Sequence, residues 1–203
     1  MAVALLPFAG KGQNNANVQP SSLAVHLIFN DFTSAANVRA TSLGTVLKNR
    51  EFGKIGNMAP GLAFNYLKGI NSLMDLSVNL AGSFLDYPFS KRTALGSDHL
   101  LLESDLSFRG KLISHNSLIN PYLQGGIGVS KYKNYYSAFL PIGTGLQVNV
   151  SKTAFILLSA QYRVPITELS SHHFYWGLGF GGSLGKKEVK KAARSEEHTS
   201  ELQ

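Results

Sequence analysis

The sequence predicts an all-β fold: an eight-stranded antiparallel up-and-down transmembrane β-barrel with a short helix in the first long loop. Three observations support this fold. Apolar and polar residues alternate with a period of two over long segments, long and short connections alternate between these segments, and aromatic residues gather at one end of them. With 44% hydrophobic and only 15% charged residues among 203, the composition excludes a disordered chain.

Other classes of protein are excluded by what the chain lacks. It contains no run of about 18 apolar residues, so a transmembrane helix is not expected. It contains no cysteine, which excludes disulfide scaffolds, thiolate metal sites and cysteine nucleophiles. No basic helix or basic platform with interleaved aromatic residues is evident, so nucleic acid is not an expected partner.

The alternation is clearest in residues 100–112. There Leu102, Leu106 and Phe108 share one face, whereas Glu103 and Arg109 share the other. Strands of soluble proteins average about 5–6 residues, but most of the segments found here reach the ~9–11 residues that a tilted strand needs to cross a membrane. The predicted strands are 23–29, 58–67, 73–85, 100–112, 119–131, 138–150, 154–164 and 174–184.

The connections between these strands alternate in length. Long links are expected at 29–58, 87–99 and 165–173, and one of intermediate length at 132–137. Short turns are expected at 68–72, 114–117 and 151–153. An up-and-down barrel shows this pattern, with long loops at one end, tight turns at the other, and both termini at the turn end.

Two local features refine the strand prediction. Asp31 precedes residues 34–49, which we expect to form one capped helix that lies over the barrel mouth or packs on its rim. The apolar face of this helix would carry Ala36, Ala40, Leu43 and Leu47. Pro121 and Pro141 fall inside predicted strands, where a missing N–H interrupts the ladder, so we expect bulges or later strand starts there.

The polar faces of the strands should line the lumen if the apolar faces contact lipid. Buried charges must pair, because an unpaired buried ion costs several kcal/mol. An eight-stranded barrel is only wide enough for side chains to fill, so a plugged core is expected, with a gated small pore or a proton-accessible site as the alternative. The predicted lumen polar network is Glu103, Asp105, Arg109, Lys111, Gln161 and Arg163.

Aromatic residues gather where the strands meet the long loops. Amphipathic rings prefer the membrane–water interface, and transmembrane barrels carry girdles of them. The predicted aromatic girdle is Phe29, Phe84, Tyr132, Phe139, Tyr162, Phe174 and Trp176.

No pattern predicts a catalytic, cofactor or metal site. The glycine clusters at 125–128 and 177–182 lie within alternating strands, and a dinucleotide fingerprint would need a helix after the strand. His172 and His173 are adjacent, and adjacent side chains in a strand point to opposite faces, so they do not chelate a metal together easily. Glycines at inward positions instead let a narrow barrel close.

The two ends of the chain are interpreted separately. We expect residues 1–12 to be a signal-peptide remnant and 13–22 a lead-in to the barrel, which spans 23–185. Residues 186–193 form a basic linker. Residues 194–203 (RSEEHTSELQ) match the translation of a common sequencing-library adapter, and we interpret them as an artefact.

Four stretches carry a resemblance to a known family: LAGSFLDYP (80–88), ALGSDHLLLESD (94–105), PYLQGGIGVSKY (121–132) and the YRVPITE corner (162–168). On these, residues 23–185 resemble the eight-stranded barrels of the outer-membrane protein A-like group of Gram-negative bacteria. The resemblance implies a monomeric barrel in the cell outer membrane that contacts the lipid bilayer and lipopolysaccharide. In many relatives a periplasmic peptidoglycan-binding domain follows the barrel, so the linker at 186–193 could lead to one.

These observations together predict an integral outer-membrane β-barrel with a structural or weakly porin-like role and no catalysis. The alternative from another class is a soluble lipocalin-like barrel that binds a small apolar ligand. A lipocalin keeps apolar residues inside, so the face with Glu103, Asp105 and Arg109 would then be wet. A third possibility is a membrane-embedded enzyme that uses lumen or loop residues such as His172.

Overall fold

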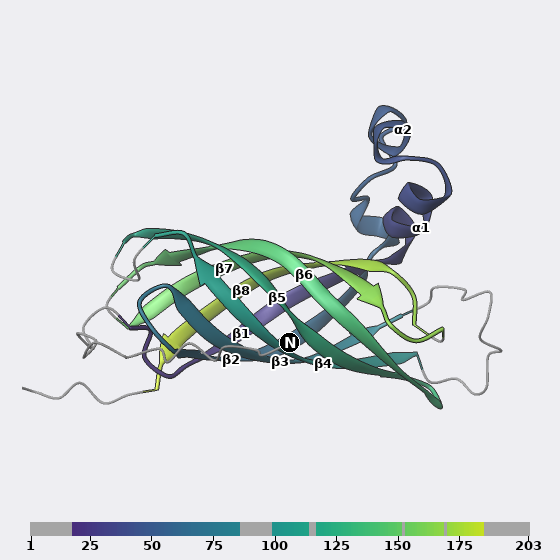
Figure 1. The fold of residues 1–203 in the computed structure, drawn as a ribbon. Helices are drawn as coiled ribbons and strands as arrows, with labels where there is room; N and C mark the ends of the chain where they lie inside the picture. The colour runs from purple at the N-terminus through teal and green to yellow at the C-terminus, as the bar shows by residue number, and fades with distance from the viewer. Residues whose placement is uncertain (1–17, 86–98, 114–116, 152, 169, 185–203) are drawn as a thin grey trace, which may run out of the picture.

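A closed antiparallel barrel forms the body of the protein (Figure 1). The computed structural model describes residues 18–85, 99–113, 117–151, 153–168 and 170–184. Within them each strand pairs with its neighbours in sequence, and the first strand closes the barrel against the eighth. The strands are β1 (Ser22–Asp31), β2 (Ala59–Gly69), β3 (Met74–Phe84), β4 (Leu100–Lys111), β5 (Ile119–Tyr132), β6 (Tyr135–Asn149), β7 (Ala154–Pro165) and β8 (His173–Ser183). The predicted fold class is confirmed.

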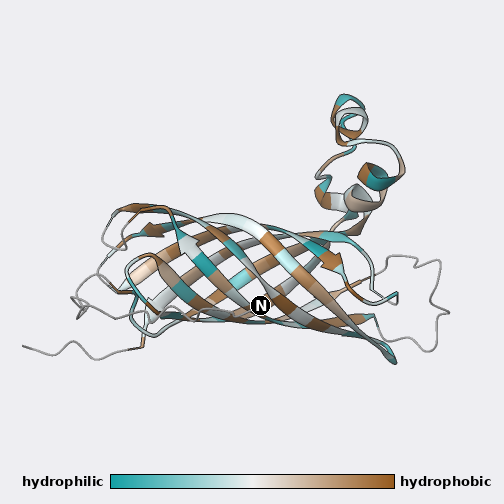
Figure 2. Ribbon diagram, in the orientation of Figure 1, coloured by the Kyte–Doolittle hydropathy of each residue, from teal (hydrophilic) through white to brown (hydrophobic). Residues whose placement is uncertain are grey.

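The barrel has its polar residues inside and its apolar residues outside. Hydrophobic and hydrophilic residues alternate along the strands (Figure 2), and on β4 the outward Leu102 and Phe108 are 42% and 51% exposed whereas Glu103 and Arg109 are 2% and 3% exposed. A soluble lipocalin-like barrel would have the reverse arrangement. The lipocalin alternative is therefore wrong.

Short polar turns connect the strands at the turn end, where β1 begins. Between β2 and β3, the Asn71 side-chain oxygen accepts hydrogen bonds from the backbone N–H groups of Leu73 (2.8 Å) and Met74 (2.7 Å). Between β6 and β7, the Ser151 hydroxyl accepts from the backbone N–H of Ala154 at 3.0 Å. Such side-chain bonds hold a turn in place of backbone bonds.

The connection between β5 and β6 is shorter than expected. Tyr132 pairs with Tyr135, so only Lys133 and Asn134 form the turn, and Lys133 takes a positive φ of 54°. The predicted link over 132–137 is wrong because both strands continue beyond their apolar segments, to 14 and 15 residues. This hairpin extends past its neighbours at the loop end (Figure 1).

The two prolines fit without bulges. Pro121 lies opposite Leu112, and Leu112 is one residue beyond the end of β4. The Pro121 carbonyl accepts a hydrogen bond from the Leu112 N–H at 2.9 Å. Because Pro121 faces this point beyond the strand, its missing N–H interrupts no ladder. Pro141 lies in β6, and the β5–β6 pairing lapses beside it but resumes in the same register at Gly128↔Phe139. No residue is inserted, so the predicted bulges and later strand starts are wrong.

The first long loop forms two helices rather than one. Helix α1 (Phe32–Ala40) is capped by the Asp31 side chain, which accepts from the Ser34 N–H at 2.8 Å, and α2 (Leu43–Lys48) is capped by Ser42. A 3₁₀ turn, η2 (Ile55–Asn57), follows. The single helix predicted over 34–49 is wrong because Ser42 takes an extended backbone and starts a new cap.

The helical segment lies beside the loop end of the barrel rather than across its mouth (Figure 1). Its buried residues are Phe32, Ser34, Ala35 and Val46. The predicted apolar face of Ala36, Ala40, Leu43 and Leu47 is exposed instead. Phe52 anchors the segment to the outer wall, with its ring centroid 5.2 Å from that of Phe174.

The predicted signal-peptide remnant (1–12), the basic linker (186–193) and the adapter-like residues (194–203) lie outside the described residues. None of the helices in the described part of the chain has the length and apolar character that a membrane span requires.

Candidate functional site: the lumen and the barrel wall

Arg163 on β7 is the centre of the buried charges nearer the loop end. Its guanidinium lies 2.5 Å from a Glu103 carboxylate oxygen and 3.2 Å from an Asp105 oxygen, both across the lumen on β4. The same guanidinium is stacked between two rings, 3.9 Å from the Tyr175 centroid and 4.8 Å from the Phe139 centroid. Arg163 is fully buried, so this paired and stacked geometry is what makes its burial tolerable.

Further polar side chains contact the two carboxylates. Asn30 donates to Glu103 at 3.3 Å, and Asn79 donates to Asp105 at 3.0 Å. His173 lies 3.3 Å from the second Glu103 oxygen and stacks on Phe32, with ring centroids 4.3 Å apart. This upper group therefore holds two carboxylates and one guanidinium.

A second group of charges lies nearer the turn end. Lys111 pairs with Asp75 at 2.9 Å. Arg109 places its guanidinium carbon 4.5 Å from the Tyr122 ring centroid, and its Nε and one terminal nitrogen have no hydrogen-bond partner among the described residues. Counted over the aspartate, glutamate, lysine and arginine side chains alone, the upper group has a formal charge of −1 and this second group a formal charge of +1.

The structure brings five of the six predicted lumen residues into these two groups. Arg109 lies with Lys111 but pairs with neither Glu103 nor Asp105, because both carboxylates contact Arg163. Gln161 is buried, but its side-chain oxygen has no partner in the described structure. The Gln124 side-chain oxygen and both ring nitrogens of His26 are also buried without a hydrogen-bond partner among the described residues.

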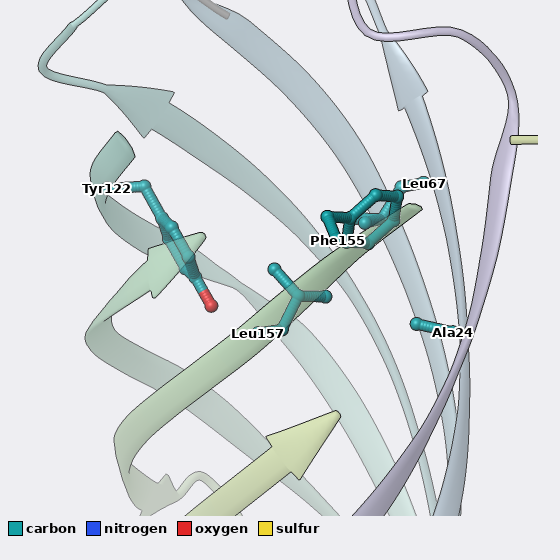
Figure 3. Close-up of a cluster of buried hydrophobic side chains, with 5 residues drawn as sticks. All are labelled: Ala24, Leu67, Tyr122, Phe155 and Leu157. Atoms are coloured by element: carbon teal, nitrogen blue, oxygen red, sulfur yellow. The ribbon is translucent and has the colours of Figure 1, made fainter. Parts of the chain in front are cut away.

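Apolar clusters close both ends of this polar lumen. The turn-end cluster consists of Ala24, Leu67, Tyr122, Phe155 and Leu157, which converge from four strands (Figure 3). The loop-end cluster consists of Phe32, Ala59, Leu85, Leu101 and Tyr132. The members of both clusters are at most 7% exposed, so in the described part of the chain apolar side chains pack into the lumen at both levels.

Inward glycines make room for the large lumen side chains. A Cβ on Gly181 would lie 2.5 Å from the Phe155 ring, and a Cβ on Gly179 would lie 2.6 Å from the His26 ring. Real Cβ atoms do not approach other atoms so closely, so the glycine run on β8 is a packing feature, as the sequence pattern indicated.

The predicted aromatic girdle is only partly on the outer wall. Phe29, Phe84, Tyr162, Phe174 and Trp176 occupy outward positions near the loop end. Tyr132 and Phe139 are buried in the lumen, at 5% and 1% exposure, so their assignment to the girdle is wrong. Tyr132 lies an even number of residues from the inward Gln124 on β5, and Phe139 lies an even number of residues from the inward Gln147 on β6. Because every second residue of a strand faces the same side, this spacing identifies both as lumen residues.

His172 lies in the loop before β8, on the outer side. Its Nδ1 is 3.0 Å from the Tyr162 hydroxyl, and the two rings stack with centroids 5.5 Å apart. Partial burial, then the nearby charges of Arg39 and His173, lower the pKa of His172 below its ordinary value.

Solved structures with the same fold are outer-membrane barrels. The N-terminal β-barrel domain of Pseudomonas aeruginosa OprF is similar with a TM-score of 0.51 and 10% identity, over 85% of this chain and 98% of that one. The outer membrane protein OprG of Pseudomonas aeruginosa gives a TM-score of 0.51 and 10% identity, over 82% and 97%. No family model and no curated protein matches the chain. The closed barrel, its inside-out polarity and these similarities establish that the chain has the fold of an eight-stranded outer-membrane β-barrel.

Proposed function

We propose that this protein is a sealed structural barrel of the outer membrane that neither conducts solutes nor catalyses a reaction. The observation that carries the proposal is the closure of the lumen by the turn-end cluster and the loop-end cluster, with paired charges between them. A side-chain-filled interior gives such a barrel rigidity without a water path.

Conductance in planar lipid bilayers tests this proposal. We expect no discrete current steps from the refolded protein, whereas a large porin measured in parallel provides the positive control. Regular steps from the unaltered protein would contradict the sealed barrel.

A gated small pore is the second candidate, and one observation favours it. Between the two clusters lie several buried polar atoms without partners in the described structure, on His26, Arg109, Gln124 and Gln161. Such atoms suit water or an ion that crosses an opened lumen. Leu67→Ala with Phe155→Ala removes the bulk of the turn-end cluster, and Leu101→Ala with Tyr132→Ala removes that of the loop-end cluster. The four substitutions together should create conductance only if this polar centre can carry ions.

The absence of catalysis is also part of the proposal. Glu103 and Asp105 are occupied by Arg163, and the His172 ring bonds to a tyrosine hydroxyl rather than to a serine. Assays of lipid acyl transfer and of proteolysis, on the unaltered protein and on His172→Ala, should show no turnover above that of the lipid alone. A rate that is lost in His172→Ala would identify an enzyme.

The proposal also covers the oligomeric state of the barrel, its location in the cell envelope and the lipid around it. We infer a monomer in a Gram-negative envelope, delivered by a signal peptide, with lipopolysaccharide around its loop end. A closed barrel leaves no strand edge for a second copy, and Arg39, Lys48, Arg50 and Lys54 make the helical segment basic, which suits anionic lipid phosphates.

A link to peptidoglycan is proposed only through a domain after residue 193. The similar OprF barrel is itself an N-terminal domain, which supports a second domain here. Membrane fractionation of the expressed protein tests the location, and light scattering in detergent tests the monomer. Recovery in the inner membrane, or a stable dimer, would contradict these inferences.

A further inference from the structure

Arg109 on β4 carries a buried charge that no described side chain neutralises. The residue is 3% exposed, and neither a hydrogen bond nor an ion pair joins it to another described residue. Its guanidinium carbon lies 4.5 Å from the Tyr122 ring centroid, and the face of a ring attracts a cation without supplying a negative charge. A buried cation without a counter-ion is costly, so this part of the lumen lacks an anion.

The carboxylates nearby are already paired with other cations. Asp75 lies opposite Arg109 in the β3–β4 register, but its Oδ1 is bound to the Lys111 ammonium at 2.9 Å. The two carboxylates of the upper group both contact Arg163. Near the turn end, therefore, two cations share one carboxylate, and one positive charge is left in excess.

The free nitrogens of Arg109 present hydrogen-bond donors to one ligand position. Nε and Nη1 are enclosed by protein and have no partner among the described residues. The third nitrogen, Nη2, makes no hydrogen bond with these residues either, but it is not among the enclosed atoms. Because Nη2 forms one fork of parallel N–H groups with Nε and another with Nη1, a ligand at Nη2 also reaches one of those two nitrogens.

Gln124 on β5 adds a second donor beside this fork. It lies opposite Arg109 in the β4–β5 register, and its side chain is buried in the lumen. Its side-chain oxygen is enclosed without a partner, whereas its amide nitrogen makes no hydrogen bond with the described residues and is not among the enclosed atoms. The atoms of both residues that stay accessible are therefore N–H donors, and donors beside an excess positive charge select an anion.

We propose that the lumen binds one small monovalent anion, of the size of chloride, between the Arg109 guanidinium and the Gln124 amide. The anion accepts hydrogen bonds from both side chains and supplies the negative charge that Asp75 does not provide to Arg109. Side chains fill the interior of an eight-stranded barrel, so the ligand is a single halide-sized ion rather than a phosphate or an organic acid. The bound ion stabilises the closed barrel and requires no conductance, so the proposal goes beyond the sealed barrel without depending on it.

The dependence of folding on chloride tests the proposal. The protein is refolded at several urea concentrations in vesicles of dioleoyl phosphatidylcholine, with sodium chloride replaced stepwise by sodium gluconate, whose anion is too large for the site. Each tenfold rise in chloride above its dissociation constant should raise the folding equilibrium constant about tenfold. Arg109→Gln should lose this dependence. Lys68→Gln is the matched control, because it removes the same charge from an exposed position on β2 and should keep the dependence.

A carboxylate placed in the site should take the role of the anion. Gln124→Glu puts a negative charge opposite Arg109, so this variant should fold equally well in chloride and in gluconate. It also carries the test if Arg109→Gln does not fold, and heat-modifiable gel mobility reports whether each variant forms a barrel. Crystals grown in sodium bromide should show one anomalous peak, beside the Arg109 guanidinium and the Gln124 amide.

Three results would overturn the site. Folding of the unaltered protein that does not depend on chloride would mean that water, rather than an anion, meets Arg109. Equal chloride dependence in the unaltered protein, Arg109→Gln and Gln124→Glu would place the effect elsewhere on the barrel. Bromide peaks confined to exposed basic side chains would show an adventitious ion only.

Discussion

The Arg163 guanidinium lies 3.9 Å from the ring centroid of Tyr175, stacked on it while its nitrogens contact two carboxylates across the lumen. The residue thus joins β7 to both β8 and β4 through the interior. Since β7 and β4 share no ladder, this one side chain connects opposite sides of the barrel, so its removal should affect the whole barrel.

Arg163→Met should destabilise the barrel by about 3–5 kcal/mol, because Glu103 and Asp105 would remain buried without their cation. Urea unfolding in vesicles, followed through the fluorescence of Trp176, the only tryptophan, measures this cost. The triple variant with Glu103→Gln and Asp105→Asn should recover most of it. A cost below about 1 kcal/mol for Arg163→Met, typical of an exposed pair, would mean that water reaches these charges.

Neighbouring leucines on β7 should respond differently to truncation. Leu157 is fully buried in the turn-end cluster, whereas Leu158 faces outward and is 45% exposed. Leu157→Ala should cost about 2–5 kcal/mol because it leaves a cavity. Leu158→Ala should cost less, since acyl chains can fill the space. The same urea titration compares them, and equal costs would contradict the assigned faces.

A charge on the outer wall should be costly only within the membrane. Leu106 is outward and near the middle of β4, so Leu106→Arg should cost about 2–4 kcal/mol, as arginine does near the bilayer midplane. Leu43 on α2 is similarly exposed, at 50% against 41%, but lies in the helical segment outside the barrel. Leu43→Arg is therefore expected to be nearly neutral. A neutral Leu106→Arg would contradict a lipid-facing wall.

The cap of α1 should be removable without loss of the barrel. Asp31→Ala removes the acceptor for the Ser34 N–H and should cost about 1 kcal/mol of helix stability. Hydrogen exchange at Ser34 and its neighbours should then accelerate. Asp31→Asn keeps an acceptor oxygen and should exchange nearly as slowly as the unaltered protein. Faster exchange throughout β1 would show that Asp31 supports the strand rather than the helix.

His172 should titrate below its ordinary pKa of 6.5, because partial burial and the charge of Arg39 both favour the neutral ring. The folded state then binds fewer protons than the unfolded state in the interval between the two pKa values. The contribution of His172 to stability is therefore complete above pH 6.5 and declines as the pH falls towards the lower, folded-state pKa. Nuclear magnetic resonance titration of the His172 ring measures the shift. Arg39→Gln should raise this pKa, and Lys48→Gln should leave it unchanged.

The alternation of residues predicted the strands and the faces of the lumen because a strand repeats every two residues. That parity places Glu103, Asp105 and Arg163 inside. The same parity would have placed Tyr132 and Phe139 there, but their prediction relied on position along the strand, which does not distinguish the two faces.

The pairing of charges could not be predicted in the same way. Arg163 contacts Glu103 across the lumen, although the two residues are 60 positions apart and lie on strands that do not pair. Their meeting depends on the stagger of all the strands around the barrel. Likewise, the break between α1 and α2 depends on Ser42, which caps a new helix. The spacing of apolar residues over 34–49 does not show whether a serine there continues one helix or starts another.

The ladder between β1 and β8 joins the first strand of the barrel to the last. Until the last strand has been synthesised, β1 has only one partner and the lumen charges are open to water. The barrel therefore cannot close before β8 has been synthesised. Closure of this ladder is also the step at which Arg163 and its two carboxylates leave water together.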